Sequence, residues 1–438
     1  MNVKNYNWMP GTSAIAGTIP VLVTMLVLLF LPANLPAKEV KPVEDLPSLV
    51  TTALANNPEL KASEARWEIF REKIAQARSF DDPMLTLAVR NGVISDPLNF
   101  GKEPMTGKAI ELSQKLPFWG KRALRGEIAA KTAESYRWTL EERKVDLARM
   151  VKEAWYRIYY IDKSIDIVDK NIKILDDFIT LAETKYSVNQ GTQTDVFKAQ
   201  VERSKLQDMR ITLEQQRTSQ QASLNTLVYR PAETPVGRIP DFSIRPMLLS
   251  GKKLRETAYE NRPEIKVLEA RIGKGEADRK LADKEFYPDF NVFGGYMQRD
   301  PVNGSAGNDM YTLGLSVNLP LQRERRHAAV AESESEIRMA NEELNSLKSS
   351  IDFGVSDLLA QLNKRRKLVE LYKTGIIPQA DQALESATIN YRVNKVDFLT
   401  LLNSQMVLFN YEREFYDSLA DYQIKLADLE ALVGGEFP

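Results

Sequence analysis

Four stretches of the chain alternate between apolar and polar residues, the pattern of a β-strand with two different faces. They cover residues 84–92, 108–117, 289–298 and 310–320. In the last stretch, Tyr311, Leu313, Leu315, Val317 and Leu319 alternate with Thr312, Gly314, Ser316 and Asn318. Strands of about ten residues with one polar face suit a transmembrane β-barrel that encloses water. Ordinary hairpins are the alternative, but they would leave four strands without further β-structure to pack on.

Long helices are predicted after the second and fourth strands. Between Val151 and Ile179 the apolar residues recur at steps of three and four, as in a coiled coil. Helix-compatible sequence covers 121–186, which at ~1.5 Å per residue predicts a rod of roughly 100 Å. The second rod covers 323–391, and kinks are expected in it at Gly354 and in the region from Gly375 to Pro378.

Shorter helices are expected before the first and third strands, at 44–79 and 252–286. Asn-Pro-Glu interrupts the first near its start and Arg-Pro-Glu interrupts the second, since proline favours the first turn of a helix. At the far end of each rod, the segments 185–200 and 390–405 contain a short break followed by a returning helix. Each rod therefore ends in a hairpin of helices.

The junction between strand and long helix has a distinct composition, Leu-Pro-Phe-Trp-Gly at 116–120. Pro117 cannot donate to a strand ladder, and Gly120 permits an unusual backbone angle. Phe118 and Trp119 lie between them, and Pro320 occupies the corresponding place after the fourth strand. We expect an amphipathic strand to lead directly into a long helix at both places.

The chain contains a tandem duplication. Residues 51–66 align with 256–271, and Asn56, Pro58 and Glu59 are among the residues that recur. The strand–helix junctions and the breaks at the rod ends recur in the same order. The sequence therefore predicts two repeats, at 38–240 and 241–438, each with a helix, two strands, a long helix and a returning helix.

Residues 1–37 have the features of an export signal. A run from Ala14 to Leu31 is almost wholly apolar, Lys4 precedes it, and Leu-Pro-Ala at 35–37 ends it. Cleavage after Ala37 or Ala33 is expected. A retained membrane anchor is the alternative, because the run is near the length that can span a bilayer. In either case the remainder of the chain leaves the cytoplasm.

Composition excludes several classes of function. The formal net charge of −1 argues against a nucleic-acid partner. The sequence has no cysteine, so it cannot form a disulfide or a cysteine-based zinc site. Its one histidine, His327, is poor evidence for a metal site. The Gly-Lys-Gly at 273–275 follows no predicted strand, so it is no dinucleotide motif. We expect no enzyme, cofactor or metal site.

These features together resemble the TolC-type outer membrane factors. The resemblance rests on the duplicated plan, on LPFWGKR at 116–122 before an Ala-rich helix, and on Tyr-x-Val turns followed by Asp-Val-x-x-Ala-Gln at 195–200. It implies an α+β membrane protein and a homotrimer in outer membrane lipid. Each chain would give four strands to a transmembrane barrel, and a long α-helical coiled-coil barrel would continue it through the periplasm.

The resemblance also implies a function. The family forms passive exit ducts that conduct small molecules or metal ions from an inner-membrane efflux pump through a periplasmic adaptor, or membrane fusion, protein. A type I secretion duct and a periplasmic coiled-coil scaffold without a pore are the alternatives. In the family, acidic side chains at the periplasmic tip ring the closed bore.

Carried over to this sequence, the positions of the acidic ring hold Thr400 and Asn403, neither of which is acidic. Asp195 holds the equivalent position of the first repeat, and Asp397 lies near the second turn. A polar constriction of these four residues is one hypothesis, and a helix N-terminal role for Asp195 is the alternative. The expected adaptor contacts are Val188, Asn189, Gln190, Gly191 and Thr192 in the first turn and Val393, Asn394 and Lys395 in the second; ordinary turn chemistry is the alternative.

Overall fold

The computed structural model describes residues 45–244, 250–302 and 304–435. Its contacts divide the chain into residues 1–42 and residues 43–438, and the second unit is described below. The predicted signal segment at 1–37, with its anchor alternative, lies outside the described residues. Among the residues that are described, no helix is both long enough and apolar enough to cross a membrane.

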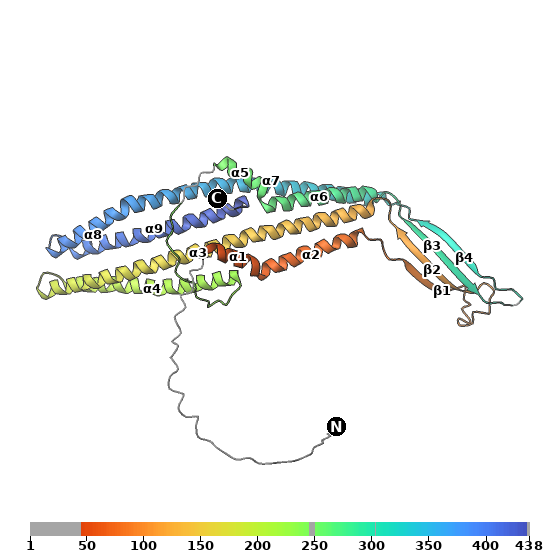
Figure 1. Cartoon of the computed structure of the whole chain (residues 1–438), viewed down its shortest axis with the longest axis horizontal. Coiled ribbons are helices and arrows are strands. Elements are labelled where there is room, and N and C mark those ends of the chain that lie inside the picture. Colours follow the sequence, from red (N-terminus) through yellow and green to blue (C-terminus); the bar gives the residue numbers. More distant parts are fainter. Residues whose placement is uncertain (1–44, 245–249, 303, 436–438) are drawn as a thin grey trace, which may run out of the picture. The chain divides into compact units, whose positions relative to one another are not determined.

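The same series of elements occurs twice (Figure 1). The first comprises α1 (Leu46–Asn56), α2 (Pro58–Arg78), β1 (Met84–Arg90), β2 (Gly107–Leu116), α3 (Lys121–Ser187) and α4 (Gln193–Val228). The second comprises α5 (Gly251–Asn261), α6 (Pro263–Lys284), β3 (Phe290–Arg299), β4 (Met310–Val317), α7 (Arg323–Leu371), η1 (Tyr372–Ile376), α8 (Ile377–Arg392) and α9 (Phe398–Val433). All four predicted strands and both long rods are present.

Proline separates the short helices completely. The single helix predicted at 44–79 is two helices, α1 and α2, because the Asn57 side chain caps a new start before Pro58. Its Oδ1 accepts from the N–H groups of Glu59 at 2.9 Å and Leu60 at 3.3 Å. Two otherwise unpaired donors of α2 are thereby satisfied.

The two long rods differ in continuity. Helix α3 runs for 67 residues without interruption, as predicted. In the second rod, α7 passes through Gly354 without a break, so the predicted kink there is wrong: the leucine side chain of Leu432 packs against this glycine. The irregularity predicted near Gly375 is present as the π-helical turn η1, which ends just before Pro378. A π turn can accommodate proline because it loosens the backbone bonding ahead of it.

The strands form one antiparallel sheet in the order β1-β2-β3-β4. Register places Leu87 opposite Ile110, and Ile110 opposite Tyr296, which itself lies opposite Tyr311. Since partners in register share a face, most of the large apolar residues of the four strands fall on one side. Thr86, Glu111, Gly295 and Thr312 form the equivalent row on the other side.

The core lies among the helices and not against the sheet. Helix α3 packs against α2, α4, α6 and α9 (Figure 1). Its predicted apolar stripe is buried at Val151, Ile158 and Val168, which are fully covered, and the stripe continues through Leu175. The coiled-coil pattern in the sequence therefore identified the central helix of the structure correctly.

Candidate functional site

The first candidate surface is the apolar face of the sheet. Nine of its apolar side chains are between 44% and 79% exposed: Leu85, Leu87, Val89, Ile110, Leu112, Val292, Tyr296, Leu313 and Leu315. A contiguous apolar surface of this kind is not left in contact with water in a monomeric soluble protein. The opposite face carries mostly polar, small and charged side chains at the alternate positions, with Phe293 and three methionines among them. The sheet thus has one face suited to lipid and one suited to water.

The sheet is also open at both edges. Strands β1 and β4 are its edge strands, with seven and eight residues. Each presents a row of unpaired backbone groups beside an apolar face, which favours pairing with another strand. In a lipid layer these groups must be paired, because no water is present to satisfy them. The sheet is consequently incomplete in a single chain.

Aromatic side chains gather where the strands meet the helices. The Phe118 ring stacks on the Tyr287 ring with centroids 4.6 Å apart, and the Trp119 ring meets the Phe290 ring edge-on at 5.8 Å. Trp119 is 74% exposed. Gly120, at φ 90°, makes the left-handed turn that starts α3. Aromatic side chains at one end of an apolar band are typical of a membrane–water interface.

A fully buried lysine, Lys121, stabilises this strand–helix junction. The Lys121 ammonium donates to Asp289 at 2.9 Å, to the Tyr287 carbonyl at 3.0 Å and to Glu285 at 3.2 Å. Asp289 also accepts from the Phe118 N–H at 2.8 Å. Burial by itself raises the pKa of the Asp289 carboxyl. The hydrogen bonds that it accepts from the Lys121 ammonium and the Phe118 N–H outweigh this effect, so the pKa of Asp289 lies below its ordinary value. Lys121 thereby joins the first half of the chain to the second.

At the rod ends, the structure gives the predicted polar residues a capping role. Thr192 accepts from the Asp195 N–H at the start of α4, while Asp195 accepts from the Thr192 N–H. At the start of α9, Asp397 accepts from the Thr400 N–H at 2.8 Å. The two halves therefore use threonine and aspartate at the same two positions in exchanged order. Asn403 is exposed on α9, one turn further on.

The two tip turns are in contact through a buried lysine that the sequence reasoning missed. The Lys185 ammonium donates to the Arg392 carbonyl at 3.1 Å and to the Asn394 side chain, and it lies 5.0 Å from the centre of the Tyr391 ring. Burial, with a contribution from the Asp195 carboxylate, raises the pKa of Tyr391 to about 12. The signal was present: the stripe of buried positions on α3 continues from Phe178 to Ala182 and then to Lys185, in steps of four and three residues.

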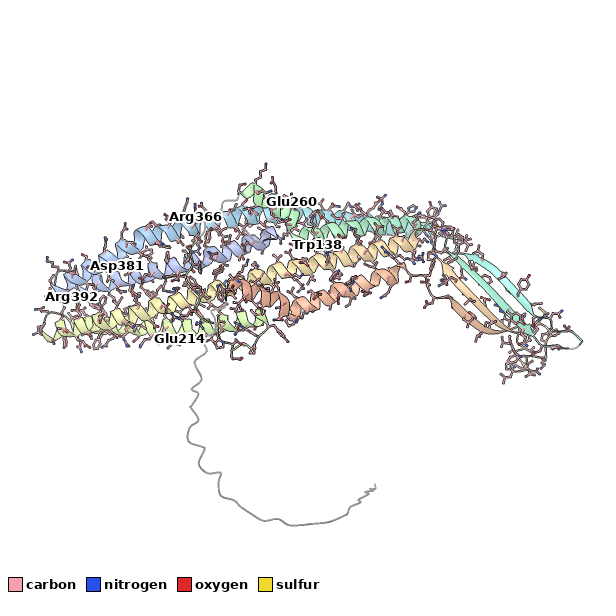
Figure 2. The ribbon with its side chains drawn as sticks, in the orientation of Figure 1. Trp138, Glu214, Glu260, Arg366, Asp381 and Arg392 are labelled. Atoms are coloured by element: carbon pink, nitrogen blue, oxygen red, sulfur yellow. The ribbon has the colours of Figure 1, made fainter. Side chains whose placement is uncertain are left out.

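The predicted adaptor contacts lie on the outer surface of these turns. Val188 is 58% exposed and Val393 is 57% exposed, at equivalent places in the two halves. Asn189 and Asn394 adopt positive φ, 58° and 62°, which asparagine tolerates better than most residues. Gln190 accepts a bond of 3.4 Å from the Asn394 amide. Gly191 and Lys395 complete the two turns, and Figure 2 labels Arg392 at the end of α8.

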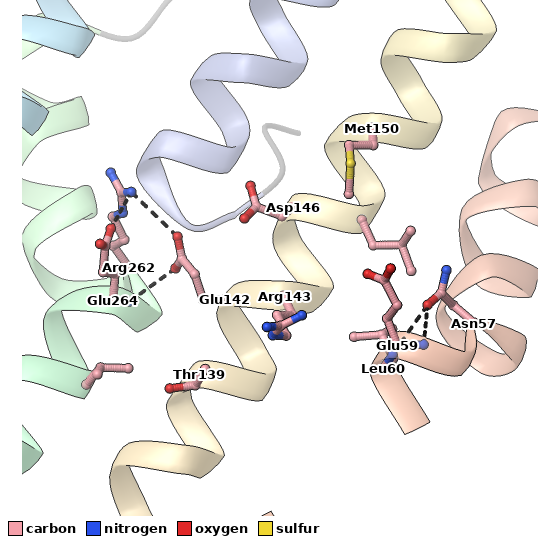
Figure 3. A pocket seen from close by; sticks show the side chains of 12 residues that line it. Asn57, Glu59, Leu60, Thr139, Glu142, Arg143, Asp146, Met150, Arg262 and Glu264 are labelled. Carbon is pink, nitrogen blue, oxygen red and sulfur yellow. Dashed lines mark hydrogen bonds and ion pairs between the residues drawn. The ribbon is translucent and has the colours of Figure 1, made fainter. Parts of the chain in front are cut away.

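A groove of about 650 Å³ lies along α3 between the starts of α2 and α6 (Figure 3). Glu142 receives the Glu264 N–H at 3.1 Å and faces the Arg262 guanidinium at 3.5 Å. Burial raises the pKa of Glu142, and Arg262 opposes the shift only partly. The groove shows ion pairs between helices and no nucleophile–base arrangement. Within the described ranges, no group of His, Asp or Glu side chains could hold a metal ion.

Comparison with known proteins identifies the family. A sequence profile described as Outer membrane efflux protein matches residues 49–228 and 254–435. The chain belongs to this family. It is 23% identical to the outer membrane efflux protein BepC of Brucella suis over 83% of this chain and 79% of that protein. It is 21% identical to the cobalt-zinc-cadmium resistance protein CzcC of Cupriavidus metallidurans, over 89% and 90% of the two chains.

Solved structures show the same fold. The outer membrane protein VceC from Vibrio cholerae superposes with a TM-score of 0.76 at 17% identity, covering 90% of this chain and 97% of that one. The predicted α+β fold class is confirmed. The protein is an efflux channel of the outer membrane that extends into the periplasm. The family consists of trimeric transport channels that work with an adaptor and an inner-membrane pump, and its members are not enzymes.

Proposed function

We propose that this chain forms the homotrimeric exit duct of a tripartite pump for small molecules or metal ions. The single observation that carries the proposal is the sorting of four strands into one apolar, exposed face and one polar face. Three chains would supply about twelve strands, and pairing of β1 with β4 of the next copy would remove every open edge. The halves 38–240 and 241–438 act as two copies of one unit within each chain.

A matched pair of substitutions tests the orientation of the sheet. Leu313 is 79% exposed on the apolar face, and Thr312, its neighbour in β4, lies on the polar face. Leu313→Lys should reduce the yield of heat-modifiable trimer in the outer membrane, since a lysine facing lipid near mid-depth costs ~2–4 kcal/mol. Thr312→Lys should leave trimer yield near that of the unsubstituted protein. Equal yields from the two variants would contradict the proposed barrel.

We place the resting constriction at the tip turns, with Thr400, Asn403, Asp195 and Asp397 as its polar residues. What supports this is their position at the starts of α4 and α9, beside the contact between the two turns. The Thr400→Ala/Asn403→Ala variant should change single-channel conductance in a planar bilayer. A resting conductance equal to that of the unsubstituted trimer would remove these two residues from the gate.

The adaptor is expected to bind the exposed valines of the two turns. An apolar side chain exposed on a turn is a typical anchor for a partner protein. Val188→Asp/Val393→Asp should abolish efflux in cells while the purified trimer still conducts. Val407→Asp is the control, because Val407 is an exposed valine on α9, 46% exposed, more than two turns beyond the tip. Equal efflux by the tip variant and the control would overturn the assignment.

A further inference from the structure

The polar face of the sheet carries more positive than negative charge. Its charged side chains are Arg90 on β1, Glu111 and Lys115 on β2, and Arg299 on β3. Three cations face one carboxylate, so each chain contributes a net +2 to this face. The apolar face carries one charge, Lys108, which faces Asp300 at 3.5 Å. The excess of charge is therefore confined to the side that faces water.

The one carboxylate is already paired. Arg90 and Glu111 form an ion pair of 2.5 Å, which leaves Lys115 and Arg299 to supply the net charge. Lys115 is exposed, and no ion pair to it occurs among the described residues. The Arg299 guanidinium donates to the backbone carbonyls of Asn308 at 2.6 Å and Pro104 at 3.4 Å and to the Met105 sulfur at 3.4 Å, and no carboxylate of the described chain lies within ion-pair distance of it.

The nearest acid to Arg299 is directed elsewhere. Asp309 accepts from the backbone N–H of Arg299 at 3.2 Å and from the Tyr296 hydroxyl. Tyr296 lies on the apolar face, so the Asp309 carboxylate is drawn away from the polar side. The guanidinium of Arg299 thus has no carboxylate within ion-pair distance among the described residues, although Asp309 lies near enough to act on it electrostatically.

The two cations lie at opposite ends of the strands. Arg299 is opposite Gly107, at the end of β2 next to the β1–β2 loop, whereas Lys115 is one residue from the helical end. Eight residues of strand separate the two levels, or ~27 Å at ~3.4 Å per residue. Since this exceeds a Debye length of ~8 Å at physiological salt, each level acts on a passing solute in turn.

We infer that the lumen of the barrel is selective for anions, with Lys115 and Arg299 as the residues that set the preference. The inference rests on the trimeric barrel proposed above, in which each level recurs three times around a water-filled bore. Rings of Arg and Lys side chains select anions in other pores, and a wall of one sign raises the local concentration of the opposite sign. The expected transported solutes are therefore small molecules that carry carboxylate, phosphate or sulfate groups.

The test uses cysteine reactivity, because the sequence has no cysteine of its own. Ser113 lies on the polar face two residues from Lys115, about 7 Å along the strand. Ser113→Cys in the intact trimer is treated with an anionic (sulfonatoethyl) and a cationic (trimethylammonioethyl) methanethiosulfonate. The two rates are normalised to those of a free thiol in the same buffer. Reagents enter from the outer mouth, so the state of the periplasmic tip does not affect the result.

The normalised rate should favour the anionic reagent. Lys115→Gln should reduce the anionic-to-cationic ratio about threefold, and more at low ionic strength, by the loss of one charge at this distance. Lys115→Arg should restore the ratio. Lys108→Gln, which removes the same charge from the apolar face of β2, should leave it unchanged. At the level of Arg299, Arg299→Gln should lower the anionic-to-cationic ratio of reaction rates measured at Ala109→Cys.

The outcomes separate the inference from the proposal beneath it. If Ser113→Cys reacts without anionic preference, or if Lys115→Gln leaves the ratio unchanged, the lumen is not selective and the inference is wrong, although the barrel stands. If Leu112→Cys on the apolar face reacts while Ser113→Cys does not, the proposed orientation of the sheet itself fails. Retention of the heat-modifiable trimer in every variant shows that the rates refer to folded protein.

Discussion

Replacement of Lys121 by methionine would remove a buried cation that joins the two halves at the strand–helix junction. Methionine matches the aliphatic part of lysine, so the change removes the charge and little of the packing. The ammonium is fully buried and donates to Asp289, Glu285 and the Tyr287 carbonyl. Without it, Asp289 keeps only the Phe118 N–H as a donor among its described partners for a carboxylate in a partly covered site.

The size of the effect follows from burial. Removing one partner of a fully buried ion pair costs ~3–5 kcal/mol, while exposed pairs contribute ~0–1 kcal/mol. The acidic partners here are 33% and 41% exposed, so water screens part of the interaction. We expect a loss of ~2 kcal/mol in the local free energy of opening. This corresponds to roughly a 30-fold larger equilibrium constant for opening of the junction.

Hydrogen exchange measures this opening directly. Backbone amides of residues 118–125, 284–287 and 289–290 should exchange roughly 30-fold faster in Lys121→Met, in trimers in detergent. Lys131→Met is the control, because Lys131 makes an exposed pair with Glu134 on the same helix. Its exchange should stay within about twofold of the unsubstituted protein. Equal protection of the junction in Lys121→Met and Lys131→Met would refute the reasoning.

Four further predictions follow from the geometry. The folded-state pKa of Asp289 is depressed, so its contribution to stability is complete above the ordinary carboxyl pKa and is lost as the pH falls through the lowered folded-state pKa. Acid should therefore speed hydrogen exchange at the junction in the unsubstituted protein but not in Lys121→Met. The pKa of Asp397 is lowered, first by the Thr400 side chain and then by the Thr400 N–H. Amides at the start of α9 should therefore also lose protection from exchange as the pH falls, and Asp397→Asn should remove that pH dependence. Lys185→Met should raise the resting conductance in planar bilayers at least about twofold by separating the tip turns, whereas Lys205→Met, which removes an exposed pair within α4, should not. Trp119→Ala should lower the yield of heat-modifiable trimer more than Trp119→Phe does, because phenylalanine keeps an aromatic ring at the interface.

Most of the fold could be predicted from the sequence because its elements are long or strictly periodic. The alternation at Leu313 and Leu315 identified a strand and its apolar face, and the stripe from Val151 onward identified the central helix. The duplication then supplied the order of elements twice. The kink at Gly354 failed because glycine permits a kink without requiring one, and packing by Leu432 keeps the helix continuous.

The candidate site was predicted less completely. Sequence position alone located the tip turns and the aromatic junction, but it missed Lys121 and Lys185. Both are lysines, which hydrophobic patterns assign to the surface. Their partners lie far along the chain, 168 residues away for Asp289 and 209 for Asn394, in the other half of the duplication. Charge balance on the sheet was equally hidden, since it depends on register between strands from different halves.

The exchanged caps at the two rod ends bear on how the halves diverged. One half has Thr192 and Asp195, and the other has Asp397 and Thr400; in both, the first side chain accepts from the backbone N–H of the second residue, and in the first half Asp195 also accepts from the Thr192 N–H. A history of single substitutions from one order to the other passes through two threonines or two aspartates, and both residue types cap a helix start. Each intermediate sequence between the two orders would therefore keep a capping side chain at the helix start. Aligned letter by letter, the two positions read as two mismatches, although the N–H of the third helical residue is capped by a side chain in both halves.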